Sequence, residues 1–292
     1  MTANDAGKPA FILTLSCEDR VGIVAAVSSH LAAIEGFILD SQQYADLDAG
    51  RFFLRIEFRA EGASFPKSVD DLRTGFASIA SRYAMDWDLL PADHRPRLLI
   101  AVSRGSHCLN DLLHRWQTGN LPVEIVGVVS NHEGLRDLTE WHGVPYHYLP
   151  VDAARRHEQE ARILGVFEET RADTLVLARY MQVLSSDMAQ RLAGRCIIIH
   201  HSFLPSFKGA RPYGKAHERG VKLIGATAYF VTGDLDEGPI IEQDIERVDH
   251  RATEQDLVRI GRDIEARVLA RAGRWTAERR VFLNGSRTVI FR

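Results

Sequence analysis

The chain contains few cysteines, and their spacing suits neither a disulfide framework nor a cysteine-rich zinc site. Its 292 residues include three, Cys17, Cys108 and Cys196, which lie far apart and form no C-x-x-C pair. We therefore expect buried, reduced thiols. Long apolar runs are also missing, and residues 1–8 contain no basic stretch leading into an apolar segment. These absences favour a soluble, cytoplasmic protein with no membrane partner.

The sequence also lacks an excess of charge of either sign. It has 36 Lys and Arg against 39 Asp and Glu, a net charge of -3, so no overall charge attracts nucleic acid. The motifs H-E-x-x-H and G-x-S-x-G, the P-loop and the complete Rossmann fingerprint do not occur. His142 and His147 have no carboxylate or thiolate partner at metal-site spacing. We therefore expect neither a metal nor a cofactor.

Residues 1–90 predict a small α+β domain. Strand patterns cover 11–17, 37–44, 50–58 and 85–89, and helical patterns follow the first and the third of them. This βαββαβ order is typical of the ferredoxin-like fold. Gly36 is predicted to close the first helix. Residues 91–96, which begin and end with proline, are predicted to be a linker.

Residues 97–292 predict a second, larger α/β domain. Apolar strands at 97–103, 123–130, 145–149, 174–178 and 196–199 alternate with helical segments, as in an open, mostly parallel, Rossmann-like sheet. A long helix is expected over 254–272, then a hairpin that turns at Asn284-Gly285. Ligands of such sheets bind at the carboxyl ends of the strands.

An imidazole and a carboxylate occupy two loops that follow apolar strands in this second domain. His200 directly follows the strand at 196–199, and Asp236 lies in the glycine-containing loop 232–238. Such a pair is suited to proton transfer and to stabilising negative charge on oxygen. We therefore predict that the two side chains lie within reach of each other, directly or through one water. The alternatives are a structural histidine and a solvated aspartate.

The segment 199–213, with its doubled histidine and its Gly-Ala-Arg-Pro-Tyr run, resembles the catalytic signature of the formyltetrahydrofolate deformylase family. The segment 235–241, Leu-Asp-Glu-Gly-Pro-Ile-Ile, agrees with it, and the resemblance covers nearly the whole chain. It implies a formyltransferase-fold domain that hydrolyses 10-formyltetrahydrofolate to formate and tetrahydrofolate, supplying formate for one-carbon and purine metabolism. The folate is then a substrate and not a cofactor.

The resemblance also implies roles for individual residues. His200 would contact the formyl oxygen and assist cleavage of the carbon–nitrogen bond, and Asp236 would orient His200 and hold the attacking water. His201 would position water or support the site, with simple packing as the alternative. The implied folate-binding residues are Arg179, Met181, Val183, Leu184, Val231, Gly233 and Gly238, and core packing would also explain Met181 and Leu184.

Two positions depart from the family pattern. Ile198 stands where the family has Asn, and Tyr229 stands where it has His. Loss of an amide that stabilises the oxyanion would slow the reaction about 100- to 1,000-fold. The sequence therefore leaves open a regulatory paralogue that binds folate or an amino acid. It also leaves open a transferase or hydrolase acting on another substrate, in which Tyr229 is a catalytic residue that supplies a hydroxyl and Ile198 shapes an altered pocket. The turn 103–108 has a single glycine, which argues against a phosphate cradle and favours water as the acceptor.

The run 19–24, Asp-Arg-Val-Gly-Ile-Val, resembles the entry to the first helix of the amino-acid-binding ACT domain. Helix-terminal amides suit a carboxylate, so Asp19, Arg20, Gly22 and Ile23 are candidate contacts for an amino-acid effector, the alternative being a dimerisation module. A sheet covered on one side predicts a homo-oligomer, either a dimer or a tetramer. A cis peptide bond is also predicted at Leu204–Pro205.

Overall fold

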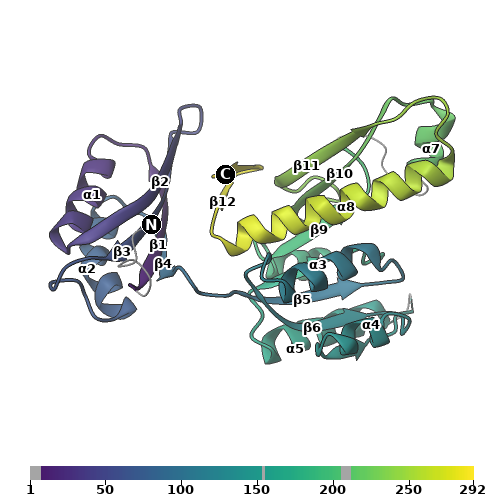
Figure 1. Ribbon diagram of the computed structural model, residues 1–292, viewed down its shortest axis with the longest axis horizontal. Helices are drawn as coiled ribbons and strands as arrows, with labels where there is room; N and C mark the ends of the chain where they lie inside the picture. Colours follow the sequence, from purple (N-terminus) through teal and green to yellow (C-terminus); the bar gives the residue numbers. More distant parts are fainter. Residues whose placement is uncertain (1–7, 153–154, 205–211) are drawn as a thin grey trace. The chain divides into compact units, whose positions relative to one another are not determined.

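The computed structural model describes residues 8–152, 155–204 and 212–292. Its described part forms two compact units: one contains the residues up to His94 with Arg279–Phe282 and Val289–Arg292, and the other contains Arg95–Glu278 with Leu283–Thr288. Figure 1 follows the chain through both. The predicted fold class is confirmed, because one sheet is antiparallel and the other is mostly parallel. The predicted cis bond at Leu204–Pro205 lies outside the described residues.

The first unit has a four-stranded antiparallel sheet in the order β2-β3-β1-β4. Its elements are β1 (Ala10–Glu18), α1 (Ile23–Ala33), β2 (Gly36–Asp46), β3 (Arg51–Ala60), α2 (Val69–Arg82) and β4 (Asp86–Pro91). Leu13 and Phe58 of the sheet share one buried core with Leu31 of α1 and Phe76 of α2. The two helices therefore bury the apolar face that the strand patterns predicted.

The end of α1 differs from its prediction in one detail. Glu35 adopts the left-handed conformation, with φ 58°, and Gly36 already begins β2. A side chain on Gly36 would stand 3.2 Å from the carbonyl oxygen of Leu31. Gly36 therefore serves close packing against the helix, while the preceding residue makes the turn.

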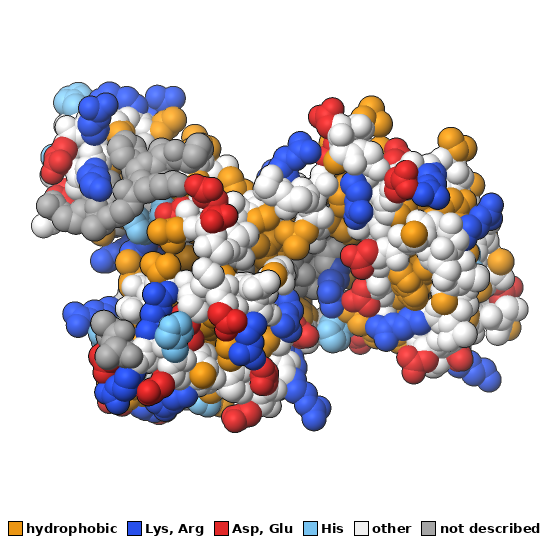
Figure 2. Space-filling model, turned by 180° about the vertical axis from the view of Figure 1, so that it is seen from behind, with side chains coloured by type: hydrophobic (Ala, Val, Ile, Leu, Met, Phe, Trp, Pro, Cys, Tyr) orange, Lys and Arg blue, Asp and Glu red, His pale blue; other side chains and the backbone are white. Residues whose placement is uncertain are grey.

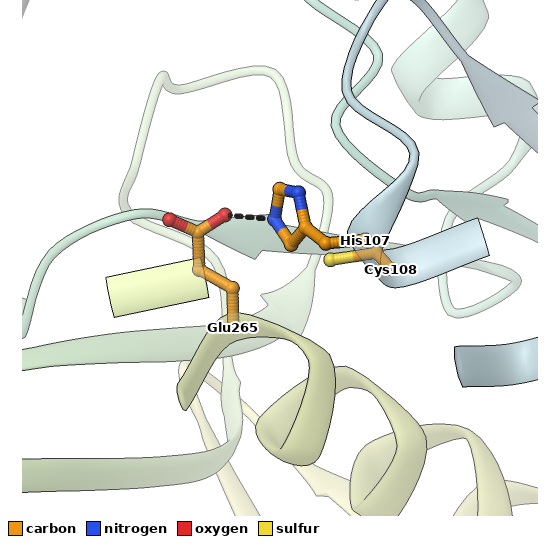
Figure 3. Close-up of side chains that lie close together, drawn as sticks. All are labelled: His107, Cys108 and Glu265. Atoms are coloured by element: carbon orange, nitrogen blue, oxygen red, sulfur yellow. Dashed lines mark hydrogen bonds and ion pairs between the residues drawn. The ribbon is translucent and has the colours of Figure 1, made fainter. Parts of the chain in front are cut away.

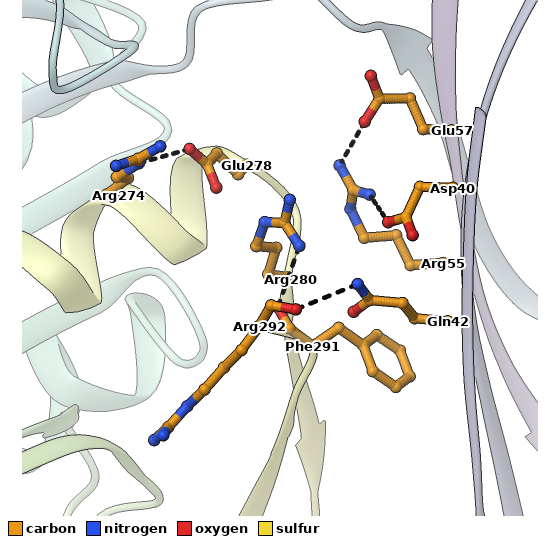
Figure 4. Close-up of polar contacts among 9 residues, drawn as sticks. All are labelled: Asp40, Gln42, Arg55, Glu57, Arg274, Glu278, Arg280, Phe291 and Arg292. Carbon is orange, nitrogen blue, oxygen red and sulfur yellow. Dashed lines mark hydrogen bonds and ion pairs between the residues drawn. The ribbon is translucent and has the colours of Figure 1, made fainter.

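The C-terminal segments of the first unit pack on its sheet through aromatic contacts. The rings of Phe53 and Phe282 lie 5.9 Å apart, those of Phe282 and Phe291 lie 5.4 Å apart, and Gln42 donates a hydrogen bond to the carbonyl oxygen of Arg292 (Figure 4). The sequence had assigned all of 97–292 to the second domain. The difference arises because strand periodicity does not show against which domain a short terminal hairpin will pack, and the two strands of this hairpin form a sheet of their own.

The second unit has a seven-stranded sheet in the order β11-β10-β9-β8-β5-β6-β7. The chain passes through β5 (Arg97–Val102), α3 (His107–Gln117), β6 (Glu124–Ser130), α4 (Arg136–Trp141), β7 (Tyr146–Tyr148), α5 (Arg156–Glu169), β8 (Thr174–Leu177), α6 (Ser186–Arg191), β9 (Cys196–His200), α7 (Pro212–Glu218), β10 (Leu223–Phe230), β11 (Ile240–Arg247) and α8 (Glu254–Ala277), and then through a hairpin of β12 (Val281–Asn284) and β13 (Arg287–Ile290). Strands β5 to β9 pair in parallel, whereas β10 and β11 are antiparallel. Helix α8 packs against β9, β10 and β11 (Figure 1).

Burial and surface charge agree with the composition. All three cysteines are buried and free, so their predicted burial is confirmed, while their reduced state stays a prediction. Acidic and basic side chains are mixed over the face drawn in Figure 2, as the small net charge predicts. Among the described residues, no helix is both long enough and apolar enough to cross a membrane.

Candidate active site

His200 and Asp236 meet as predicted. His200 is the last residue of β9, and Asp236 lies in the loop between β10 and β11. The distance from Nδ1 of His200 to Oδ1 of Asp236 is 3.2 Å, and each side chain is 8% exposed. Asp236 has φ 59°, a left-handed conformation that aspartate tolerates better than most residues. The loop thereby turns its carboxylate toward the end of the sheet.

Tyr229 is a second donor to the same carboxylate. Its hydroxyl donates a hydrogen bond of 2.9 Å to Oδ1 of Asp236. Burial raises the pKa of Tyr229, and the negative charge of Asp236 raises it further, so the phenol remains protonated. An ionised Asp236 only accepts hydrogen bonds, which places the proton of a neutral His200 on Nδ1 and leaves a lone pair on Nε2.

The two positions that are predicted to depart from the family pattern are neighbours. Tyr229 of β10 is the register partner of Ile198 on β9. Side chains two residues apart on a strand share a face, so Ile198 also lies on the face of His200. A change at either position therefore alters one small region beside the imidazole.

The ring of His201 stacks on that of His200, and its Nδ1 atom is hydrogen-bonded to an arginine. The two imidazole rings stack, with centroids 4.9 Å apart and planes inclined by 17°. Nη1 of Arg179 lies 2.6 Å from Nδ1 of His201. Burial, together with the positive charge of Arg179, lowers the pKa of His201 to about 4. His201 is therefore neutral at pH 7.

Glu265 of α8 holds this arginine, and its role was not evident from the sequence. Its carboxylate lies 3.3 Å from Nε of Arg179 and 2.8 Å from Nε2 of His107, and it accepts a hydrogen bond of 2.6 Å from the hydroxyl of Tyr213. Burial alone would raise the pKa of Glu265, but these partners lower it overall. The available signal was a carboxylate on the apolar face of α8, between the buried Ile264 and Val268.

The potential ligand atoms of three clustered side chains, His107, Cys108 and Glu265, lie within 4.8 Å of one another. Figure 3 shows the three side chains. A cation there would compete with the guanidinium of Arg179 for Glu265. Burial raises the pKa of Cys108 well above its ordinary value, so its thiol keeps its proton and is a poor ligand. The hydrogen bonds of Glu265 explain the cluster without a metal.

A cavity of about 470 Å³ opens beside this network. Its lining includes Ser103, Arg104, Gly105, His107, Asn131, His132, Arg179, Met181, Gln182 and Arg262. This cationic lining was not evident from the sequence, because Arg104, Arg179 and Arg262 come from three distant segments. The glycine-poor turn after β5 contributes side chains here, in place of a backbone cradle.

The predicted folate-binding residues do not all meet in one place. Arg179 and Met181 line the cavity. Leu184 and Val231 are partly buried and pack against the core, which is the alternative that the sequence left open for Leu184. Val183 and Gly233 are exposed, whereas Gly238 is buried, and a side chain on it would stand 1.8 Å from the carbonyl oxygen of Phe230. The role of these residues in folate binding stays a prediction.

The candidate effector residues are only partly accessible. Asp19 and Arg20 are exposed, but the amide of Asp19 already donates to the carbonyl oxygen of Gly50. Gly22 has φ 97°, which accounts for the glycine. Ile23 is buried in the core of the first unit, so its side chain is not available to a surface ligand. Effector binding stays a prediction for the turn as a whole.

Comparisons with known proteins show the family to which the chain belongs. A family model described as formyl transferase matches residues 96–272. A formyltetrahydrofolate deformylase of Bacillus subtilis is 50% identical over 280 residues, which cover 96% of this chain and 93% of that protein. This chain belongs to the formyltetrahydrofolate deformylase family. The family predicted from the doubled histidine is thereby confirmed.

Other members of the deformylase family show the same relationship. The family member of a Corynebacterium species is 49% identical and covers 96% of this chain and 98% of its own length. A crystal structure of formyltetrahydrofolate deformylase from Burkholderia mallei is 51% identical with a TM-score of 0.93, and the match covers 97% of this chain and all of that one. Glycinamide ribonucleotide transformylase 1 of Symbiobacterium toebii is more distant, at 30% identity and a TM-score of 0.65, with 70% of this chain and 98% of that one covered.

Proposed function

We propose that this protein hydrolyses 10-formyltetrahydrofolate to formate and tetrahydrofolate. The observation that carries the proposal is the contact between His200 and Asp236 at the carboxyl end of β9, in a chain that matches deformylases over nearly its full length. A base held by a buried carboxylate is what activation of water requires. No residue of this mechanism needs a bound metal or cofactor.

The proposed reaction uses the lone pair on Nε2 of His200. A water molecule attacks the formyl carbon while Nε2 takes one of its protons, and negative charge develops on the formyl oxygen. Collapse of this intermediate breaks the carbon–nitrogen bond, and the proton passes to the departing folate nitrogen. Asp236 keeps the imidazole oriented and stabilises its positive charge between the two steps. Formate and tetrahydrofolate result.

The decisive experiment measures formate release from 10-formyltetrahydrofolate by the purified protein in steady state. Sustained formate production, in equal amount to tetrahydrofolate, is the expected result. Saturable folate binding without any formate would contradict hydrolysis and favour the regulatory paralogue.

A second candidate is transfer of the formyl group to an anionic amine, favoured by the cationic lining of the cavity beside Arg179. Such an acceptor would carry a phosphate or a carboxylate, which arginine binds well. Adding amines of this class to the formate assay separates the two functions. Transfer predicts a formylated amine and a matching fall in formate, whereas hydrolysis predicts unchanged formate.

We further propose that the protein acts in the cytoplasm as a homo-oligomer, a dimer or a tetramer, and that its first unit binds an amino-acid effector. Strand β2 lies at the edge of the sheet and exposes Phe37, Ile38 and Leu39, which supports pairing with a second copy. Sedimentation at micromolar concentration should give at least a dimer. A single monomeric species would contradict it.

Substitutions at positions 198 and 229 test whether these two residues limit the rate of deformylation. Ile198→Asn combined with Tyr229→His is expected to raise kcat for deformylation at least about tenfold, equivalent to roughly 1.4 kcal/mol in the barrier. The reason is that the cross-strand pair lies on the face of His200, where an amide could donate to the developing oxyanion. Steady-state kinetics would measure the change.

The matched control for this prediction is Ile198→Leu with Tyr229→His, which changes side-chain shape without adding an amide and should not accelerate the reaction. A double variant no faster than the wild type would contradict the idea that these two positions limit turnover. A wild type as fast as the Bacillus subtilis relative, measured side by side, would also contradict it.

A further inference from the structure

The hydrogen bond between Arg179 and His201 fixes the tautomer of this histidine. A guanidinium can only donate, so Nδ1 of His201, 2.6 Å from Nη1 of Arg179, must accept. A neutral imidazole whose Nδ1 accepts carries its proton on Nε2. The two histidines are therefore opposite tautomers. Nε2 of His201 carries a proton, whereas Nε2 of the neutral, Asp236-bound His200 carries a lone pair.

The Nε2 donor of His201 is buried and, among the described residues, has no hydrogen-bond partner. Buried donors in folded proteins are nearly always paired. An unpaired buried donor beside a predicted catalytic base indicates that an atom of a bound ligand accepts its hydrogen bond. Because the ring stacks on His200 at 4.9 Å, this donor belongs to the same region as the base.

The arginine behind His201 is itself tightly held. Arg179 has φ 65°, a conformation that is uncommon for a long side chain. Its guanidinium lies 3.3 Å from Oε2 of the buried Glu265, which also contacts His107, while Tyr213 donates to Oε1. This network keeps His201 in one orientation.

We propose that His201 is the donor to the formyl oxygen, and that Arg179 and Glu265 are positioning residues that hold it in the donating tautomer. The inference rests on the proposed deformylation and assigns a separate step to each histidine. His200 takes the proton of the attacking water, while His201 hydrogen-bonds the oxygen on which charge develops. The donor remains neutral, so no additional proton is transferred.

The charges around His201 support a neutral donor. The groups that act on it are Arg179 and His200, which lower its pKa, and Glu265 and Asp236, which raise it, while burial has the largest effect. The ring of Tyr213 lies 6.5 Å away. With a pKa of about 4, His201 keeps this form throughout the neutral range.

The kinetic test compares His201→Phe in two backgrounds. Phenylalanine keeps a flat ring against His200 but has no donor, so kcat should fall about 100-fold with little change in KM. In the Ile198→Asn, Tyr229→His background, the new amide should share the role and the loss should be less than about tenfold. The exposed His250 provides a control, and His250→Phe should leave kcat unchanged.

The spectroscopic test does not depend on activity. In ¹⁵N NMR spectra of the wild type, His201, assigned by comparison with His201→Phe, should be the neutral Nε2–H tautomer from pH 8 down to about pH 5. Arg179→Gln removes a charge that lowers the pKa of His201, so this pKa should rise and the acid limb of kcat should move to higher pH. The Nδ1–H tautomer at pH 7 would overturn the proposal.

These experiments test the proposed deformylation and the role of His201 separately. A wild type that releases no formate contradicts the proposed function, and the role of His201 falls with it. A wild type that releases formate, but loses the same factor from His201→Phe in both backgrounds, overturns the role of His201 alone.

Discussion

Replacing Asp236 with asparagine should lower kcat for formate release by about 1,000-fold, within the range of roughly 10² to 10⁴ that positioned acid–base groups contribute. Asp236 contacts Nδ1 of His200 and accepts from Tyr229 through the same oxygen. The amide that replaces it carries no charge to stabilise the protonated imidazole. Steady-state kinetics measures kcat, and circular dichroism verifies the fold.

Asp234 provides the matched control, because it is an exposed aspartate in the same loop. Asp234→Asn should keep kcat within about twofold of the wild type. His200→Asn should cost about as much as Asp236→Asn, and the double variant should cost little more than either one, since the two residues act as a unit. A variant at Asp236 that retains a tenth of wild-type activity would contradict its assigned role.

The fold and the central pair could be predicted because both depend on local pattern. Buried parallel strands are continuous apolar runs, and β9 was recognisable from 196–199 alone. The carboxyl ends of such strands meet at one edge, so His200 at the end of a strand was expected in a crevice. Asp236 followed from its loop and from the family signature. Their contact could be predicted because His200 ends one recognisable strand and Asp236 lies in the loop after another, and the position of a strand end depends only on the local sequence pattern.

The contacts of Glu265 and the pairing of Ile198 with Tyr229 could not be predicted, because they depend on tertiary contacts between distant segments. Glu265 meets its partner His107 across 158 residues, and a single glutamate on a helix usually indicates a solvated face. The pairing of Ile198 with Tyr229 depends on the register of β9 against β10. The resemblance predicted that both residues depart from the family pattern, but only the register shows that they are neighbours.

Glu265→Gln is the variant with the largest expected effect on stability. Removing one partner of a buried ion pair costs about 3–5 kcal/mol, because the remaining charge stays buried without compensation. Here that charge is Arg179, whose side chain is 21% exposed, while that of Glu265 is 1% exposed. We therefore expect a fall of about 3 kcal/mol in the free energy of unfolding of the second unit. Urea denaturation followed by tryptophan fluorescence would measure it.

The effect of Glu265 on stability should also depend on pH with a definite sign. Its pKa in the folded protein is lowered from an ordinary value of 4.5, so its contribution is fully present above about pH 4.5 and is lost as the pH falls through the folded pKa. The difference between wild type and Glu265→Gln should therefore be constant near neutrality and should shrink on acidification. Glu278→Gln, which removes the carboxylate paired with the exposed Arg274 on the same helix, should cost less than about 1 kcal/mol. If both variants lowered the free energy of unfolding by the same amount, the burial of the Glu265 network would add no stability beyond that of an exposed ion pair. Packing of the cavity wall would then hold Arg179 in place.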